Sequence, residues 1–251
     1  TWQTPVPTNG DSASLSEIAT LIVDRITSDL KQSFAEDTPT QTKVIHHDAT
    51  TKFPAIRIKP NLLITSPPYL TRLDYIKNHL SEIALLNEIQ NFDIDHLRNH
   101  MIGTPTVPKH LSNFEDLGEI ATTLLHNISE HSSYASKRYY MPFYRNYFAM
   151  LKDSIKQTVA QLASHSYGIY VVQQSRYKDI IVDLPGIIVE LLSYHCSKVQ
   201  VIDSFPVGPT LATLNPKHNR SHSTRLYESI VYFEINKDGK QKGAPKFGSN
   251  Q

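Results

Sequence analysis

The chain has 251 residues, of which 39% are hydrophobic and 20% are charged. This composition is typical of a globular protein that buries a core in one domain or two. Lys and Arg total 25 and Asp and Glu total 24, so the formal net charge of +1 gives no overall attraction for nucleic acid or membrane. The single cysteine, Cys196, excludes a disulfide framework and a cysteine-rich zinc site, and we expect a cytoplasmic protein. No apolar run approaches the roughly 20 residues that cross a bilayer, so no membrane partner is predicted.

Glycine is scarce, with nine residues in the whole chain. Its average usage in proteins is about 7%. No two of these glycines have the G-x-G spacing, which excludes a Walker loop and a dinucleotide-binding fingerprint.

The chain begins with an irregular segment, residues 1–13, rich in Pro, Thr and Ser. Ser14 and Glu17 have capping-box spacing, and apolar residues at helical spacing continue to Leu30, which predicts an amphipathic helix. Further helices are predicted over 75–89, 114–131, 140–163 and 184–195. Strands are predicted over 43–45, 61–65, 167–173, 199–205 and 229–235, and the run 61–65 is of the buried type.

Alternating strands and helices favour an α/β sheet that is covered by helices on both faces. The last two predicted strands are separated only by a loop, which favours an antiparallel pair at one edge of the sheet. The polar stretch 90–113 is expected to leave the core, and the polar tail 236–251 is expected to be disordered.

The most informative segment is Ser66-Pro67-Pro68-Tyr69, which directly follows the apolar run NLLIT. Pro67 and Pro68 lack backbone N–H groups and fix φ, so the chain leaves the sheet as a stiff, extended loop whose carbonyls can face a ligand. Ser66 adds a hydroxyl and Tyr69 adds a flat face for a planar group. Ligands of open α/β sheets bind at the carboxyl ends of strands, where this loop is expected. The alternative is a rigid turn without a ligand.

These four residues resemble the catalytic motif of amino-group DNA methyltransferases, which methylate the exocyclic nitrogen of adenine or cytosine. The Ser-Pro-Pro-Tyr form is similar to that of the cytosine-N4 enzymes. The likeness continues through SPPYLTRLDYIKNHLSEIALL, RNHMIG, YYMPFYRNYFAMLKDSI, GIYVVQQSRYKDIIVDLPGIIVELL and YESIVYF. It spans about residues 43–235, and SPPY with the following Asp-Tyr is its specific part.

The resemblance implies an α/β fold of the Rossmann-like, S-adenosylmethionine-dependent methyltransferase type. It implies that the Ser66 hydroxyl and the Pro67 carbonyl accept hydrogen bonds from the amino group and so make its nitrogen a better nucleophile. Pro68 stiffens the loop, and Tyr69 stacks on a base that is flipped out of double-stranded DNA. Transfer from S-adenosylmethionine is then a direct displacement that depends on positioning and needs no cysteine nucleophile.

Further site residues are implied on either side of the loop. Asp48, in VIHHDAT, resembles the family's "gDa" element, whose acidic residue contacts the adenine amino group of the cofactor, although His47 replaces the glycine. The alternative is an aspartate that caps a turn. Asp74 and Tyr75 are expected to line the cofactor site or to position the loop, with a helix N-cap as the alternative for Asp74. Glu228 is expected to orient the loop and not to react.

The family also holds its cofactor with a glycine-rich turn, roughly Phe-x-Gly-x-Gly, and this chain has none. The only glycine before Asp48 is Gly10. We therefore expect the fold to be incomplete on its amino-terminal side, with the glycine-rich segment upstream of Thr1 or on a second polypeptide. The third interpretation is a decayed homologue without catalysis, which the intact SPPY motif disfavours.

Contacts with DNA are predicted in the basic loop 215–225, through Lys217, Arg220 and Arg225. The aromatic and basic segment 136–148 has the composition of a nucleic-acid surface, but an amphipathic helix that packs into the core is the favoured interpretation. The twelve histidines include no H-E-x-x-H pattern, and no metal site is predicted.

Three regions result: an irregular segment with an amphipathic helix (1–42), a methyltransferase catalytic region (43–235) with a helical excursion at about 90–140, and a polar tail (236–251). The expected activity of the complete enzyme is cytosine-N4 DNA methylation. Adenine-N6 methylation is the first alternative. A non-catalytic DNA-binding or regulatory subunit is the second.

Overall fold

The computed structural model describes residues 24, 25, 28, 43–70, 73–87, 93–107, 116–207 and 225–237. The chain divides into two compact units, residues 1–46 and 47–251, and each is described by itself. In the first unit, residues 24, 25 and 28 are helical, and most of the predicted amphipathic helix lies outside the described residues. The predicted strand at 43–45 is wrong, because these residues are exposed and pair with no strand of the described chain.

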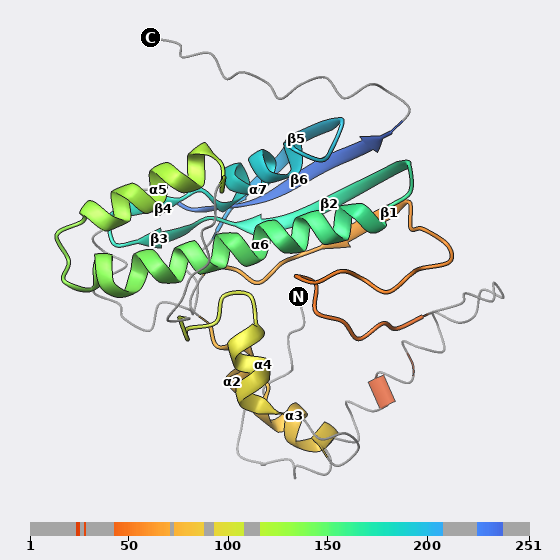
Figure 1. The fold of residues 1–251 in the computed structure, drawn as a ribbon, viewed down its shortest axis with the longest axis horizontal. Coiled ribbons are helices and arrows are strands. Elements are labelled where there is room, and N and C mark those ends of the chain that lie inside the picture. Colours follow the sequence, from red (N-terminus) through yellow and green to blue (C-terminus); the bar gives the residue numbers. More distant parts are fainter. Residues whose placement is uncertain are drawn as a thin grey trace, which may run out of the picture. The chain divides into compact units, whose positions relative to one another are not determined.

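A mixed sheet forms the centre of the second unit, and its described strands have the order β1-β2-β6-β5 (Figure 1). They are β1 (Leu62–Thr65), β2 (His165–Gln173), β5 (Lys198–Pro206) and β6 (Tyr227–Asn236). β1 runs parallel to β2, whereas β6 runs antiparallel to both β2 and β5. The α/β class and the antiparallel pair at one edge are thereby confirmed.

Three helices pack against one face of this sheet (Figure 1): α5 (Glu119–Glu130), α6 (Met141–Gln161) and α7 (Leu184–Ser193). Their apolar residues bury the core together with the inward side chains of the strands. The largest fully buried members include Phe143, Tyr147, Phe148, Leu191 and Phe233. The predicted helices at 114–131, 140–163 and 184–195 are confirmed within a few residues at each end.

The opposite face of the sheet corrects the expectation that helices cover both faces. Along β2, buried residues alternate with partly or fully exposed ones, so only one face is covered within the described part of the chain. The prediction that 61–65 is a buried strand is also wrong, because three of its five residues are exposed and Leu63 and Thr65 are only partly buried. Leu62 and Ile64 are 54% and 68% exposed, because β1 is an edge strand among those described and these side chains point to the open face.

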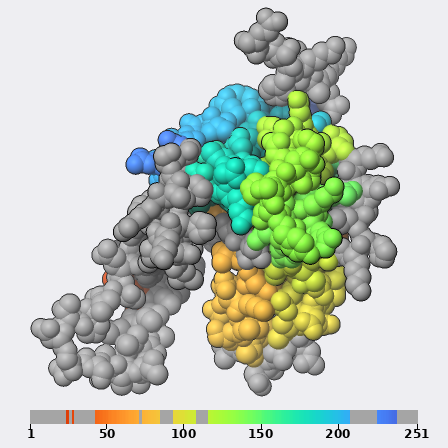
Figure 2. Space-filling model, turned by 90° about the vertical axis from the view of Figure 1, so that its left-hand side faces the viewer, coloured from red at the N-terminus to blue at the C-terminus, as the bar shows by residue number. Residues whose placement is uncertain are grey.

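Between β1 and α5 the chain forms three short helices: α2 (Tyr75–Asn78), α3 (Leu80–Asn87) and α4 (Ile94–His100). The described residues between Leu73 and Val107 are called the helical excursion below; it begins and ends earlier in the chain than the predicted one at about 90–140. A single turn of π-helix, η1 (Ser136–Tyr140), leads into α6. The orange and yellow surface of this helical excursion adjoins the green surface of α5 and η1 (Figure 2), and the Tyr139 hydroxyl donates to the Pro105 carbonyl at 3.2 Å. The excursion is therefore attached to the sheet's covering helices.

A two-stranded hairpin, β3 (Ser175–Tyr177) and β4 (Ile180–Val182), follows β2 and was not predicted from the sequence. Its turn contains Lys178 with φ 56, a conformation that usually favours glycine or asparagine. None of the helices formed by the described residues has both the length and the apolar character needed to span a membrane.

Candidate functional site

The Ser66–Tyr69 loop leaves β1 at its carboxyl end, as the sequence predicted. The edge strand ends at Thr65, and Pro67 and Pro68 carry the chain away from the sheet without helix or strand structure. Since β1 and β2 are parallel and Thr65 lies opposite Tyr170, the loop sits beside the last residues of β2. This is the edge of an α/β sheet at which ligands bind.

Three contacts from other elements hold the loop in place. The hydroxyl of Tyr147, on α6, donates to the Pro68 carbonyl at 2.6 Å. The backbone N–H of Tyr69 donates to the hydroxyl of Tyr75, at the start of α2, at 3.0 Å. The Tyr69 hydroxyl donates to Oε1 of Glu228, on β6, at 2.5 Å. The loop is thus fixed at two consecutive residues, Pro68 and Tyr69. The groups that hold it come from the start of α2, from the core helix α6 and from strand β6.

Tyr147 is the most deeply buried of these anchors, with no exposed surface. Burial raises the pKa of its phenol far above the usual value, so the hydroxyl keeps its proton and remains a donor. Gly103, with φ 83, lies against the same ring: a Cβ at this position would approach Tyr147 Cδ2 to 3.6 Å. The excursion and α6 therefore meet at the tyrosine that holds the loop.

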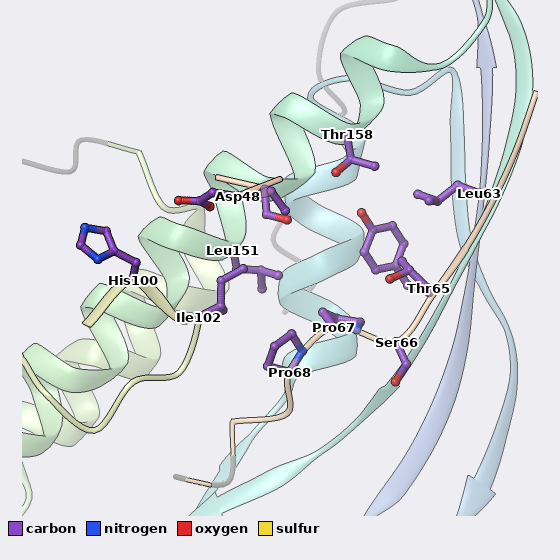
Figure 3. Close-up of a pocket in the computed structure, with 13 residues that line it drawn as sticks. Asp48, Leu63, Thr65, Ser66, Pro67, Pro68, His100, Ile102, Leu151 and Thr158 are labelled. Carbon is purple, nitrogen blue, oxygen red and sulfur yellow. The ribbon is translucent and has the colours of Figure 1, made fainter. Parts of the chain in front are cut away.

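A cavity of about 350 Å³ opens beside the loop (Figure 3). Its volume lies at the lower end of the range of about 300–1,000 Å³ for small-molecule sites. It is lined by residues from the turn at 48–49, from β1 and its loop, from the excursion, from α6 and from β2: Asp48, Ala49, Leu63, Thr65, Ser66, Pro67, Pro68, His100, Ile102, Leu151, Ser154, Thr158 and Tyr170.

Asp48 caps a turn, as one of the two interpretations of its sequence predicted, and it lies at the cavity. Its Oδ1 accepts hydrogen bonds from the backbone N–H and the hydroxyl of Thr50, both at 2.8 Å, so it caps a turn. It also lines the cavity (Figure 3). Both bonds use Oδ1, and among the described residues no hydrogen bond to Oδ2 is seen, so Oδ2 could accept one from a ligand.

The other polar groups of the cavity come from α4 and α6. Ser154 and Thr158 are spaced i,i+4 on α6 and line one wall, with Leu151 one turn before them. His100 Nδ1 lies 2.8 Å from the His96 carbonyl. A carbonyl can only accept, so Nδ1 carries the proton and Nε2 of the neutral ring is an acceptor. The cavity therefore offers acceptors, hydroxyl groups and apolar walls together.

The loop separates two surfaces. In Figure 3 the hydroxyl of Ser66 points away from Asp48 and from the body of the cavity. It donates to the Tyr69 hydroxyl at 3.3 Å on that outer side. Burial, followed by the hydrogen bond to Glu228, raises the pKa of Tyr69. Ser66 lines the cavity with its hydroxyl turned away from Asp48, so a ligand at Asp48 and a second molecule at the Ser66 hydroxyl could contact different parts of the loop.

Asp74 and Tyr75 are not among the residues that line the cavity. Asp74 is the N-cap of α2, accepting from the Lys77 N–H at 3.1 Å, and its Oδ2 accepts from Nε and Nη2 of Arg98, both at 3.0 Å. Desolvation acts to raise the pKa of Asp74, but the bonds from Lys77 and Arg98 outweigh it and the pKa is lowered. The N-cap alternative describes this residue, and Tyr75 positions the loop.

Of the three residues predicted to contact DNA, the structure describes one. Lys217 and Arg220 lie outside the described residues, and Arg225 is exposed just before β6. In the aromatic segment 136–148, Phe143 and Tyr144 belong to the buried core, as the favoured interpretation had it.

Cys196 follows α7, partly buried against the core, and burial raises the pKa of its thiol to about 12. The rings of His96 and His100 stack at 4.0 Å between centroids. Over the ranges that the structure describes, no three His, Cys, Asp or Glu side chains come together in a way that could hold a metal ion.

No protein-family model, curated protein or solved structure matches this chain. Its function therefore has to be inferred from the site itself.

Sequence reasoning missed the cavity residues Ser154 and Thr158 and the anchor Tyr147. All three lie on α6. The apolar spacing that predicts this helix includes Tyr147 and so indicates a core residue at that position. Two hydroxyl residues spaced i,i+4 beside Leu151 were the available signal for a polar wall. His100 gave no signal except its i,i+4 spacing from His96.

Proposed function

We propose that this chain carries the catalytic loop of a site-specific DNA methyltransferase that transfers a methyl group from S-adenosylmethionine to the exocyclic amino group of a flipped cytosine. The observation that carries the proposal is the anchored Ser66–Tyr69 loop at the carboxyl end of β1, beside a mostly apolar cavity whose lining includes Ser66 and the carboxylate of Asp48. The sequence resemblance of the same four residues supports it independently.

The cavity fits the adenosyl part of the cofactor. Oδ2 of Asp48 could accept from the amino group of a purine, while Leu63, Ile102 and Leu151 offer apolar surface to the rings. Ser154 and Thr158 could bind ribose hydroxyls. When bound, S-adenosylmethionine would supply an electrophilic methyl group on a positively charged sulfur.

The outer side of the loop would receive the base. The amino nitrogen of cytosine is a poor nucleophile because its lone pair is delocalised into the ring. Ser66 Oγ and the Pro67 carbonyl would accept its two hydrogens and localise the lone pair on nitrogen. Within the described chain no hydrogen bond reaches the Pro67 carbonyl, whereas that of Pro68 is occupied by Tyr147.

The methyl transfer balances without a protein nucleophile. The methyl group would come from bound S-adenosylmethionine, whose sulfur would keep the electron pair of the C–S bond, and the amino group held by Ser66 and Pro67 would release a proton to water. The contribution of the protein is alignment, since a direct displacement needs the reacting atoms in line and close. Tyr147, Tyr75 and Glu228 would supply that alignment by holding two consecutive loop residues.

The test is methylation of DNA by the protein, expressed from its complete coding region and purified with any polypeptide that copurifies in equal amount. Unmethylated plasmid and tritiated S-adenosylmethionine are the substrates, and nuclease digestion with mass spectrometry identifies the modified base. N4-methylcytosine is expected, while N6-methyladenine would support the first alternative. No modified base and no cofactor binding by a folded protein would overturn the proposal.

A matched pair of serine variants locates the activity. Ser66→Ala is expected to lower kcat by about 100-fold or more, in the range observed when one aligned polar group is removed from a catalytic site. Ser164→Ala, at an exposed serine before β2, should leave kcat unchanged. Equal activity of the two variants would contradict the site.

A non-catalytic DNA-binding subunit is the second candidate. It would need no cofactor, and this sequence has no glycine-rich turn of the kind with which the methyltransferase family holds one. This candidate predicts DNA binding without methylation, with Arg225→Ala weakening binding and Ser66→Ala leaving it unchanged.

A further inference from the structure

A chain of hydrogen bonds links the catalytic loop to the central strand β6. Ser66 Oγ donates to Tyr69 Oη at 3.3 Å, and Tyr69 Oη donates to Glu228 Oε1 at 2.5 Å. The position of the glutamate is set by the sheet, where Glu228 lies opposite Gln173 of β2 and Phe205 of β5. The backbone of the last acceptor is therefore held between two neighbouring strands.

The direction of these bonds follows from the chemistry of the groups. A hydroxyl has one proton to donate and two lone pairs that accept, whereas an ionised carboxylate can only accept. Glu228 thus accepts a hydrogen bond from the Tyr69 hydroxyl, and the Tyr69 oxygen accepts one from the Ser66 hydroxyl. The Ser66 oxygen is left with lone pairs and has no second proton to offer a ligand.

We propose that Glu228 is a positioning residue which, through Tyr69, fixes the Ser66 hydroxyl as a hydrogen-bond acceptor for the amino group of the target base. This inference rests on the proposed function, since only a ligand that donates hydrogens gains from an acceptor at Ser66. With the direction reversed, Ser66 would point a proton at the amino group, compete for its lone pair and oppose the displacement.

The protonation of Tyr69 agrees with this role. Burial raises the pKa of Tyr69, and the hydrogen bond to Glu228 raises it further, while the bond from Ser66 lowers it. The charges of Glu228 and the neighbouring Tyr75 act in the same direction as burial. The phenol is therefore neutral at physiological pH and can pass the polarity of the carboxylate on to Ser66.

The competing interpretation is that Glu228 merely holds the Tyr69 ring in place. Glu228→Gln separates the two, because glutamine keeps the shape of the side chain but loses its charge: the amide oxygen is a weaker acceptor, and the NH2 group can donate to Tyr69 instead. A donated bond reverses the chain. Glu234→Gln is the matched control: Glu234 lies on the same strand and also accepts from a tyrosine hydroxyl, that of Tyr232, at 3.0 Å.

The first measurement is steady-state methylation of DNA by four proteins: wild type, Glu228→Gln, Tyr69→Phe and the double variant. Glu228→Gln is expected to lower kcat by about tenfold or more, the equivalent of one hydrogen bond, with KM for DNA nearly unchanged. In the Tyr69→Phe background, which has no hydroxyl to relay the effect, Glu228→Gln should cause no further loss. Glu234→Gln should behave as wild type. An unchanged kcat for Glu228→Gln, or losses that multiply in the double variant, would overturn the relay.

The second measurement does not depend on activity. The pKa of the Tyr69 phenol is followed by NMR with ring-labelled tyrosine, and Tyr69→Phe identifies the signal. Glu228→Gln should lower this pKa and Ser66→Ala should raise it, according to the signs of their contributions. If Glu228→Gln leaves the pKa unchanged in an active enzyme, the relay is wrong and the proposed function stands. If the pKa responds but the protein methylates no base, the hydrogen-bond chain is real, and both the proposed function and the role of Glu228 in it fail.

Discussion

Gly168 occupies a position in β2 where the structure leaves no room for a side chain. It pairs with Phe233 of β6, and the phenyl ring lies over its Cα. A Cβ at position 168 would lie 2.1 Å from Cε1 and Cζ of that ring. Phe233 is completely buried, so its ring cannot turn away without displacing the core. Gly168→Ala is therefore expected to destabilise the fold.

Two opposing effects set the size of this change. Overpacking a well-packed core costs typically about 1–3 kcal/mol. Replacing glycine by alanine in a strand returns about 0.5–1 kcal/mol, because the unfolded chain loses conformational freedom. β2 lies between β1 and β6 and cannot shift easily, which places the overpacking cost near the upper end. We expect a net loss of about 2 kcal/mol in the free energy of unfolding.

Urea denaturation followed by circular dichroism measures this loss. The control is Phe233→Leu, alone and combined with Gly168→Ala, since leucine lacks the ring atoms that Cβ would meet. The double variant should be more stable than the sum of the single effects predicts, by about 0.5 kcal/mol or more. Wild-type stability for Gly168→Ala, or strictly additive losses in the double variant, would refute the steric reasoning.

Three further changes follow from the site. Tyr147→Phe removes the donor to the Pro68 carbonyl and should cost about 1–2 kcal/mol in urea denaturation, with a loop more sensitive to proteolysis; an unchanged stability would contradict the anchor. Asp74→Asn keeps the N-cap but loses the charge paired with Arg98. Because the pKa of Asp74 is lowered in the folded state, wild type should be more stable than the variant by about 1 kcal/mol at neutral pH, and this difference should vanish as pH falls through the folded-state pKa. The thiol of Cys196, with its pKa raised to about 12, should react with iodoacetamide near neutral pH far more slowly in the folded protein than in urea, and equal rates would contradict its burial.

The periodicity of apolar residues predicted the elements that have one apolar and one polar face. Helix α6 and strands β2 and β6 were predicted within a few residues, because their apolar side chains recur at the spacing of a helix or a strand. The same signal misled at 61–65, where an apolar run indicates burial but says nothing about whether neighbours cover both faces. The β3–β4 hairpin was missed because its turn contains Lys178 in place of a glycine or asparagine.

The site was predicted as far as its local chemistry reached. The unusual Ser-Pro-Pro-Tyr sequence after an apolar run indicated the loop 66–69, and the resemblance of VIHHDAT to the family's "gDa" element indicated Asp48. The contacts that hold the loop come from Tyr147 and Glu228, 79 and 159 residues further along the chain from the loop residues they bind. The resemblance of YESIVYF links Glu228 to the loop, whereas no motif in the sequence links Tyr147 to it.

The anchors also show which parts of the fold the loop depends on. Leu62 and Ile64 of β1 are largely exposed, whereas the groups that hold the loop come from α2, α6 and β6. The geometry of the loop is therefore set by elements that follow it in the chain. Polar substitutions at Leu62 or Ile64 would alter the open edge and face of the sheet, while the hydrogen bonds of Pro68 and Tyr69 would remain. Any partner that extends the sheet beyond β1 would therefore meet a loop whose Pro68 and Tyr69 are already held by these hydrogen bonds.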